Sequence, residues 1–172
     1  AEVLFENGSD KRSFDRGEIP FYSWVDVGSN FKISEVNAAC LYGQLLKSDE
    51  IISRRLANWN LYYRKLSPLA DQQKFTLPPN TSGHNAHIFY IKLPTTESRV
   101  AMMKYLNENG IGATFHYIPL HSSTMGKKCS TFSGTDQFTT TESGRLLRLP
   151  LYHTITTSQI ESVVAHVYRF FE

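Results

Sequence analysis

The feature that most constrains the fold is an alternation of strand and helix patterns from residue 84 to the C-terminus. Residues 86–93 (AHIFYIKL) and 111–118 (IGATFHYI) are rich in β-branched and aromatic side chains, and a third short strand is expected at 148–151 (RLPL). Helical patterns follow each strand segment. This β-α-β-α-β-α order lets helices cover one face of a small sheet, so we predict an α/β chain ending in a small α+β domain.

The ends of these helices are marked in the sequence. Thr95 can cap a helix expected at 97–109. Gly110 follows that helix and can end it, because glycine readily takes the left-handed conformation. Thr139 with Glu142, and Thr156 with Gln159, have the spacing of capping boxes. We therefore expect a short helix after Thr139 and the last helix after Thr156.

The first part of the chain has a different pattern. Residues 1–7 resemble the end of a helix, and 8–31 show neither strand nor helix periodicity. An irregular segment of that length is typical of a functional or interface loop. Ser34 is expected to cap a helix running to about Lys47, and a second helix from Ser48 is expected to stop at Pro68.

A polar linker between these helices and the alternating region gives the domain prediction. The linker contains Pro78, Pro79 and Gly83, residues that interrupt regular structure. We predict three parts: 1–32, the tail of a larger domain with an interface loop; 33–83, connecting helices and the linker; and 84–172, the C-terminal small domain.

Composition narrows the class of protein. Lys and Arg number 18 against 16 Asp and Glu, and the basic residues are dispersed, which disfavours a nucleic-acid-binding surface. No apolar run is long enough for a membrane span. Cys40 and Cys129 have no metal or disulfide spacing, which favours a reducing, cytoplasmic setting. The first methionine is Met102, so we expect the chain to start inside a longer protein or to be processed.

Histidines are the first candidates for chemistry. His84 and His87 form one pair and His116 and His121 another, and two pairs could bind a metal for a small hydrolase. No carboxylate lies close to them in sequence, and the spacing across a loop and a strand fixes no common face. Ordinary hydrogen-bonded histidines are therefore favoured, and no metal ligand is assigned.

A second candidate is an anion site. Gly28, Ser29 and Asn30 come shortly before a predicted helix N-terminus, where free N–H groups and the helix dipole attract phosphate. No Walker loop, GxGxxG fingerprint, GxSxG elbow or paired carboxylates accompany it. From the residues alone, the chain is an α/β fragment with a possible anion site.

Five segments in order resemble one enzyme family across nearly the whole chain. They are VGSNFKISEVNAACLYGQL, RRLANWNLYYRKL, HNAHIFYIKLP, GIGATFHYIPLHSS and SGRLLRLPLYHTITTSQIESVV. Together they are similar to the C-terminal portion of fold type I pyridoxal-phosphate (PLP) dependent sugar aminotransferases of the DegT/DnrJ/EryC1/StrS type. The resemblance implies a small sheet covered by helices, preceded by a loop and two helices from the junction with the large domain.

The resemblance also implies site residues. In such enzymes the lysine bonded to PLP lies in a Ser-x-His-x-x-Lys segment, upstream of anything in this chain, so no catalytic residue is assigned. Asn30 matches the position that reaches the PLP phosphate of the other subunit of a homodimer, and Lys32, two residues on, could assist with its charge. Tyr117 and His121 match the segment that approaches the nucleotide sugar, and Arg148 is a candidate for its phosphate.

The segments YSWVDVGS, NAHIFYIKL and FHYIPLHSS look most similar to the subgroup acting on dTDP-4-oxo-6-deoxyglucose. That subgroup implies amino transfer from glutamate for cell-surface polysaccharides, such as the O-antigen of lipopolysaccharide or enterobacterial common antigen. Without the missing N-terminal PLP domain we expect the chain to be inactive. The alternative is a non-catalytic nucleotide-sugar-binding or regulatory module that keeps the small-domain fold.

Overall fold

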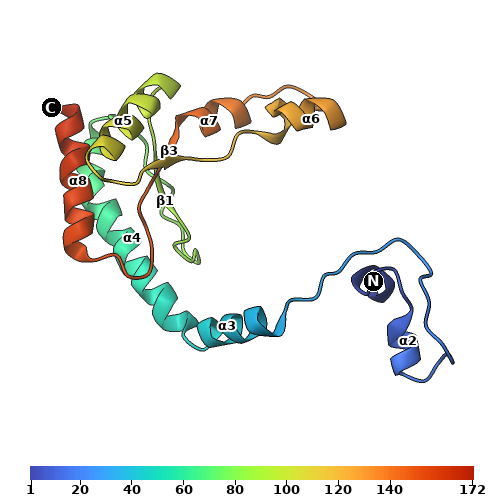
Figure 1. Cartoon of the computed structure of the whole chain (residues 1–172). Coiled ribbons are helices and arrows are strands. Elements are labelled where there is room, and N and C mark those ends of the chain that lie inside the picture. The colour runs from blue at the N-terminus through green and yellow to red at the C-terminus, as the bar shows by residue number, and fades with distance from the viewer. The chain divides into compact units, whose positions relative to one another are not determined.

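The computed structural model describes residues 1–172 and divides into two compact units, an N-terminal unit (Ala1–Ser48) and a C-terminal unit (Asp49–Glu172) (Figure 1). The first unit contains the helices α1 (Glu2–Phe5), α2 (Lys11–Asp15) and α3 (Glu35–Leu45). The second is built from α4 (Ser48–Asp71), β1 (Phe89–Lys92), α5 (Thr96–Glu108), β2 (Thr114–Phe115), the 3₁₀ turn η1 (Leu120–Ser122), α6 (Thr124–Cys129), α7 (Thr139–Arg145), β3 (Leu146–Leu149) and α8 (Thr157–Phe171). None of these helices combines the length and the apolar character that crossing a bilayer requires.

The C-terminal unit is organised by a three-stranded antiparallel sheet in the order β1-β3-β2. Strands appear in all three predicted regions, but β2 has only two residues. The backbone groups just before β2 form hydrogen bonds outside the sheet. The Asn107 side chain donates to the Ala113 carbonyl (3.1 Å) and accepts from the Ala113 N–H (3.2 Å). The end of α5 thus replaces the strand partner that residues 111–113 were expected to have.

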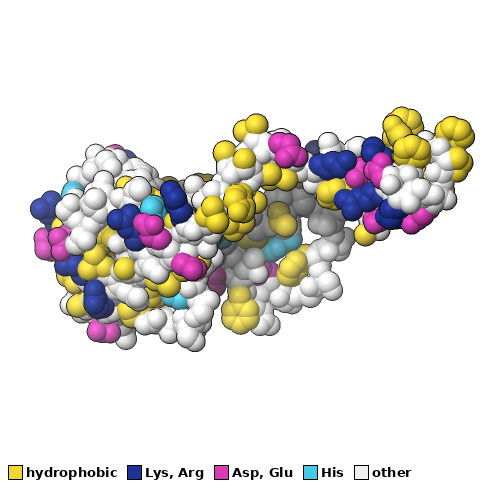
Figure 2. All heavy atoms as spheres, turned by 90° about the horizontal axis from the view of Figure 1, so that it is seen from below, with side chains coloured by type: hydrophobic (Ala, Val, Ile, Leu, Met, Phe, Trp, Pro, Cys, Tyr) yellow, Lys and Arg dark blue, Asp and Glu magenta, His cyan; other side chains and the backbone are white.

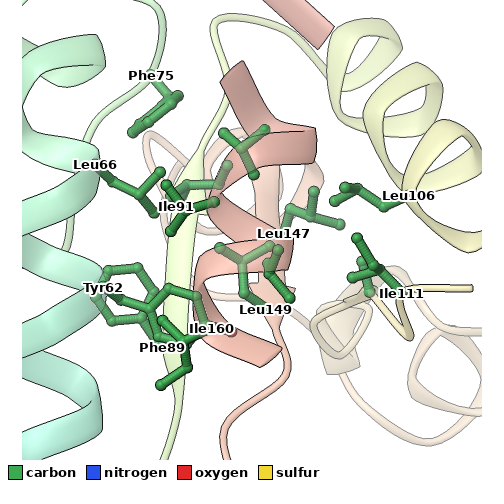
Figure 3. Packing of buried hydrophobic residues seen from close by; sticks show 14 of the residues in the cluster. Tyr62, Leu66, Phe75, Phe89, Ile91, Leu106, Ile111, Leu147, Leu149 and Ile160 are labelled. Atoms are coloured by element: carbon green, nitrogen blue, oxygen red, sulfur yellow. The ribbon is translucent and has the colours of Figure 1, made fainter. Parts of the chain in front are cut away.

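One face of this sheet carries the core. Phe89 and Ile91 of β1 lie opposite Leu149 and Leu147 of β3, and all four are buried. They pack in one cluster with side chains from α4, α5 and α8 (Figure 3), including Tyr62, Leu66, Met102, Leu106, Ile160 and Val167. The expected layer of helices on one face of a small sheet is confirmed.

Tyr62 adds a polar contact to this core. Its ring stacks on Phe89 with centroids 5.0 Å apart, and its hydroxyl donates to the Pro150 carbonyl at 2.9 Å. Burial raises the pKa of Tyr62, so the phenol stays neutral and remains a donor. The bond links α4 to the chain immediately after β3.

Helix caps were predicted with mixed success. Thr95 and Thr156 each form a complete capping box, so α5 and α8 begin as expected, and Gly110 follows α5 with a φ of 76°. The box predicted for Thr139 and Glu142 is wrong. The Asp136 carboxylate instead accepts from the N–H of Thr139 at 2.8 Å, because it lies three residues earlier, at the spacing of a cap.

The expected stop at Pro68 is also wrong, since α4 continues to Asp71. Pro68 lies in the last turns, where its missing N–H removes only one helical bond. Leu66 and Leu69 on either side are buried, and the Ser67 hydroxyl donates to the Tyr63 carbonyl at 2.7 Å. Burial of this apolar face outweighs the lost hydrogen bond.

The N-terminal unit contains a short helix that the periodicity did not reveal. α2 lies within the region expected to be loop and carries an exposed ion pair between Lys11 Nζ and Asp15 Oδ2 (2.9 Å). The loop is closed at its base by glycines: a Cβ on Gly8 would lie 1.9 Å from the Asp26 carbonyl oxygen, and one on Gly28 would lie 2.0 Å from the Gly8 nitrogen. Only residues without a side chain allow the two backbone segments to approach this closely.

Replacing Leu66 by alanine tests the core. Leu66 is fully buried between the helices and the sheet, so Leu66→Ala should lower the free energy of unfolding by about 2–5 kcal/mol. Chemical denaturation followed by tryptophan fluorescence measures the change. Lys104→Ala, at a side chain 74% exposed, is the matched control and should leave stability nearly unchanged; equal effects of the two variants would contradict this packing.

The pair between Lys92 of β1 and Glu142 of α7 predicts a pH dependence. The hydrogen bond from Lys92 (Nζ–Oε2 2.5 Å) lowers the pKa of Glu142 below its usual 4.5. The ionised Glu142 therefore stabilises the folded state at pH values above 4.5. This stabilisation is lost as the pH falls through the lowered pKa. Glu142→Gln should reduce the melting temperature more at pH 7 than at pH 3; an equal reduction at both would contradict the pairing. Glu108→Gln, at an exposed pair, is the control.

Candidate functional site

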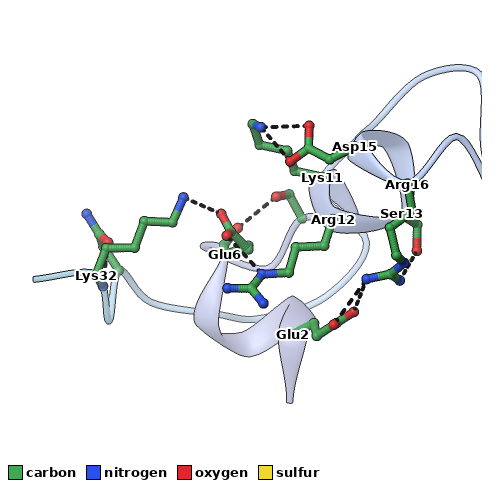
Figure 4. A network of polar contacts seen from close by, with 10 residues as sticks. Glu2, Glu6, Lys11, Arg12, Ser13, Asp15, Arg16 and Lys32 are labelled. Carbon is green, nitrogen blue, oxygen red and sulfur yellow. Dashed lines mark hydrogen bonds and ion pairs between the residues drawn. The ribbon is translucent and has the colours of Figure 1, made fainter.

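The two predicted cofactor residues lie in the N-terminal unit, where a polar network surrounds Glu6 (Figure 4). The Glu6 side chain is only 8% exposed and accepts from Lys32 Nζ at 2.7 Å and from Arg12 Nε at 3.3 Å. The hydrogen bond from Lys32 is the largest cause of the lowered pKa of Glu6, which keeps the carboxylate ionised. The charge of Lys32 is therefore already compensated within the chain.

Asn30 has a different environment. Its Oδ1 accepts from the backbone N–H of Lys32 at 3.1 Å, while no hydrogen bond within the chain uses its amide nitrogen. The residue is exposed, and its backbone forms an isolated antiparallel bridge with Glu6. Asn30 thus presents free N–H donors, which can bind a phosphate oxygen.

The anion site expected from Gly28, Ser29 and Asn30 needs one correction. α3 begins at Glu35, and its cap is Ser34, whose hydroxyl accepts from the N–H of Asn37. Asn30 lies several residues before that helix, so it does not share the helix dipole. Any anion binding here depends on the amide of Asn30 itself.

The predicted substrate residues lie in the C-terminal unit, and Tyr117 borders a pocket of about 270 Å³ there. Tyr117 is 79% exposed, and its hydroxyl makes no hydrogen bond within the chain, so it can donate to a ligand. The wall also contains Arg99, which donates from Nε to the Gly144 carbonyl (3.0 Å) and lies over the ring of Phe115. Sequence reasoning missed Arg99, because it belongs to α5 and no motif marks it.

His121 directly precedes Ser122 of the pocket wall and forms a pair that the sequence did not predict. Its Nε2 lies 3.0 Å from Asp136 Oδ2, with exposed side-chain fractions of 22% and 18%. Asp136 also accepts from the hydroxyl and N–H of Thr140, which lines the pocket. The hydroxyl of Thr140 is the largest cause of the lowered pKa of Asp136, so a carboxylate faces the imidazole.

Arg148 is separate from that pocket. It lies on the central strand β3, opposite Tyr90 on one side and Thr114 on the other. Its Nε is buried without a hydrogen-bond partner, as is Nδ1 of His116. Buried polar atoms without partners are uncommon in folded proteins, so these two nitrogens retain unused hydrogen-bonding capacity.

The remaining histidines have separate neighbours. His84 packs on Trp59 with ring centroids 4.5 Å apart, and its Nδ1 accepts from the N–H of Ala86 at 3.1 Å. No three His, Cys, Asp or Glu side chains lie close enough together to hold a metal ion. The hydrolase built on four histidines therefore finds no ligand cluster.

Comparison with known proteins decides the family. The family model of the DegT/DnrJ/EryC1/StrS aminotransferases matches residues 1–168. The chain belongs to this family. The family-level resemblance of the five segments is thereby confirmed.

Solved structures of several aminotransferases share the fold. The aminotransferase TlmJ of Streptoalloteichus hindustanus matches with a TM-score of 0.80 and 22% identity over 98% of this chain. PseC of Helicobacter pylori, an aminotransferase involved in pseudoaminic acid biosynthesis, matches with a TM-score of 0.81 and 18% identity over 99% of this chain. The PLP form of the putative sugar aminotransferase Spr1654 of Streptococcus pneumoniae matches with a TM-score of 0.74 and 16% identity over 95% of this chain.

The matched region is only part of each of these proteins. It spans 43% of the TlmJ chain, 44% of the PseC chain and 40% of the Spr1654 chain. The predicted fold class, a portion of an α/β aminotransferase with a small helix-covered sheet, is confirmed.

Proposed function

We propose that this chain is the C-terminal part of a PLP-dependent transaminase that moves an amino group from glutamate to a nucleotide-linked 4-keto-6-deoxyhexose. The match of the family model to residues 1–168 is the observation that carries this proposal. The resemblance of YSWVDVGS and FHYIPLHSS favours dTDP-4-oxo-6-deoxyglucose as the substrate. The product would serve cell-surface polysaccharide synthesis, and the enzyme would work in the cytoplasm.

Asn30 fits a role in holding the cofactor. PLP acts as an electron sink that stabilises negative charge at the reacting carbon. Its phosphate needs hydrogen-bond donors, and the unused amide N–H groups of exposed Asn30 can supply them. Lys32 fits less well, because its ammonium group is paired with Glu6. Lys32 would instead contribute through its backbone N–H, which donates to Asn30 Oδ1 at 3.1 Å and so orients the amide.

The reactive lysine would come from the missing N-terminal portion. The family's Ser-x-His-x-x-Lys segment is not found in this sequence. Lys32 and Lys92 form ion pairs with Glu6 and Glu142, at 2.7 and 2.5 Å, so neither ammonium group is free. The chain alone is therefore proposed to be inactive.

The substrate would meet the C-terminal unit at the Tyr117 pocket. The free Tyr117 hydroxyl and the His121 imidazole would contact the nucleotide sugar. Arg148 would donate to a phosphate if the buried Nε becomes accessible in the complete site.

The surface of the N-terminal unit supports a homodimer and contacts with the missing domain. Large apolar side chains are exposed along it, and hydrophobic atoms are visible on the surface in Figure 2. The most exposed are Phe21 (82%), Val27 (81%), Trp24 (75%) and Val36 (73%). Apolar surface of this kind marks an interaction site. We propose that a second subunit and the N-terminal portion cover it.

A non-catalytic nucleotide-sugar-binding module is the second candidate. It is favoured by one observation: the C-terminal unit has its own buried core and its own pocket. Such a module would bind a nucleotide sugar without any cofactor.

Activity measurements on two proteins separate these functions. The chain extended with a family N-terminal portion should consume glutamate and aminate dTDP-4-oxo-6-deoxyglucose when PLP is present. The 172-residue chain alone should do neither. An extended protein that folds and binds PLP but transfers no amino group to any nucleotide keto-sugar would contradict the transaminase proposal.

Asn30→Ala and Lys32→Ala in the extended protein test the cofactor contact. Loss of one hydrogen bond to a charged phosphate should weaken PLP binding by about tenfold in Asn30→Ala. Lys32→Ala should have a smaller effect, because that charge is paired with Glu6. PLP titration of the apoenzyme measures both, and the reverse order would show that Lys32 binds the phosphate.

A further inference from the structure

The His121–Asp136 pair carries an inference about how the proposed substrate is held. Asp136 lies before α7, and its two carboxylate oxygens have different partners. Oδ1 accepts from the N–H of Thr139 at 2.8 Å, while Oδ2 lies 3.0 Å from His121 Nε2 and accepts from the Thr140 hydroxyl. Both oxygens accept from N–H groups at the start of α7, since the N–H of Thr140 lies 3.4 Å from Oδ1 and 3.2 Å from Oδ2, but only Oδ2 faces the imidazole.

This contact fixes the state of the ring. An ionised carboxylate can only accept, so Nε2 of His121 must carry a proton. In the neutral imidazole the other nitrogen, Nδ1, is then an acceptor with a free lone pair. Nδ1 makes no hydrogen bond within the chain and is not among its buried unpartnered atoms, so it can reach a ligand.

The ring is also held in place from its flank. Phe132 packs against His121 with centroids 4.4 Å apart, and the segment after His121 is fixed by Ser122, whose hydroxyl donates to the Pro119 carbonyl at 3.0 Å. Ser122 and Tyr117 line the same pocket. The imidazole of His121 is therefore held between Phe132 and Asp136, and the next residue along the chain, Ser122, belongs to the pocket wall.

We propose that Asp136 is a positioning residue that holds His121 in the Nε2–H form, so that Nδ1 accepts a hydrogen bond from a sugar hydroxyl of the bound nucleotide sugar. The inference rests on the proposed function for its ligand. Within the structure it rests on the partners of the two carboxylate oxygens. It differs from a purely structural role, in which Asp136 would only cap α7.

Asp136→Asn separates capping from positioning. Asparagine is as good a helix cap as aspartate, so its oxygen can keep the bond from the N–H of Thr139. Its amide nitrogen then takes the place of Oδ2 and donates to His121 Nε2, which forces the proton of the ring onto Nδ1. The N–H of Thr140 keeps an acceptor in Oδ1, which lies 3.4 Å away, and the Thr140 hydroxyl turns to accept from the amide. The variant keeps the helix and reverses the tautomer.

Long-range ¹H–¹⁵N correlation spectra of the ¹⁵N-histidine-labelled 172-residue chain measure the tautomer, with His121→Gln assigning the signal. The unchanged chain should show the Nε2–H form at His121 and Asp136→Asn the Nδ1–H form. Thr140→Val is the matched control, because it removes a bond to Asp136 but keeps the carboxylate; its tautomer should be unchanged. An Nδ1–H form in the unchanged chain, or no reversal in Asp136→Asn, would overturn the proposal.

Titration with dTDP-glucose and with dTDP gives the second readout. Asp136→Asn should weaken the binding of dTDP-glucose about five- to tenfold and leave the affinity for dTDP unchanged, because only dTDP-glucose carries the sugar hydroxyls. If dTDP-glucose binds both proteins equally, the positioning role is wrong while the proposed function stands. If the unchanged chain binds neither ligand, the substrate contact in the proposed function fails instead.

Discussion

The antiparallel pairing of β1 with β3 is the contact on which the C-terminal unit depends. Its inward side chains, Phe89 and Ile91 against Leu149 and Leu147, supply the sheet side of the core, and α4 covers them through Tyr62. β3 follows α7 directly, and β2 runs into the segment that carries Tyr117 and His121. The pairing therefore fixes the elements that hold the candidate substrate residues, as well as the core.

Helix caps and strand positions could largely be predicted, because they depend on residues close in sequence. The capping boxes at Thr95 and Thr156 need only neighbouring side chains, and strands form in all three predicted regions. The Asp136 cap and the passage of α4 through Pro68 could not be predicted, since both depend on competing local donors and on tertiary burial. Propensity is a weak guide where packing decides.

The candidate site shows the same division. Tyr117 and His121 are candidates by motif. Arg99, which lines the same pocket as Tyr117, and Asp136, which pairs with His121, come from other parts of the chain and carry no spacing signal. The compensation of Lys32 by Glu6 is likewise invisible in the sequence, because it depends on α1 folding back toward the end of the loop. Motif similarity selects candidate segments, and the structure shows which of their polar atoms have no hydrogen-bond partner within the chain.

The central claim is that this chain is part of a larger PLP enzyme. The most direct test is the intact mass of the protein isolated from its natural source, together with its visible absorbance after PLP is added. We predict a mass well above the 19.6 kDa of this chain and the visible band of lysine-bound PLP. A mass of 19.6 kDa with no such band would contradict the claim and favour a module that acts without the cofactor.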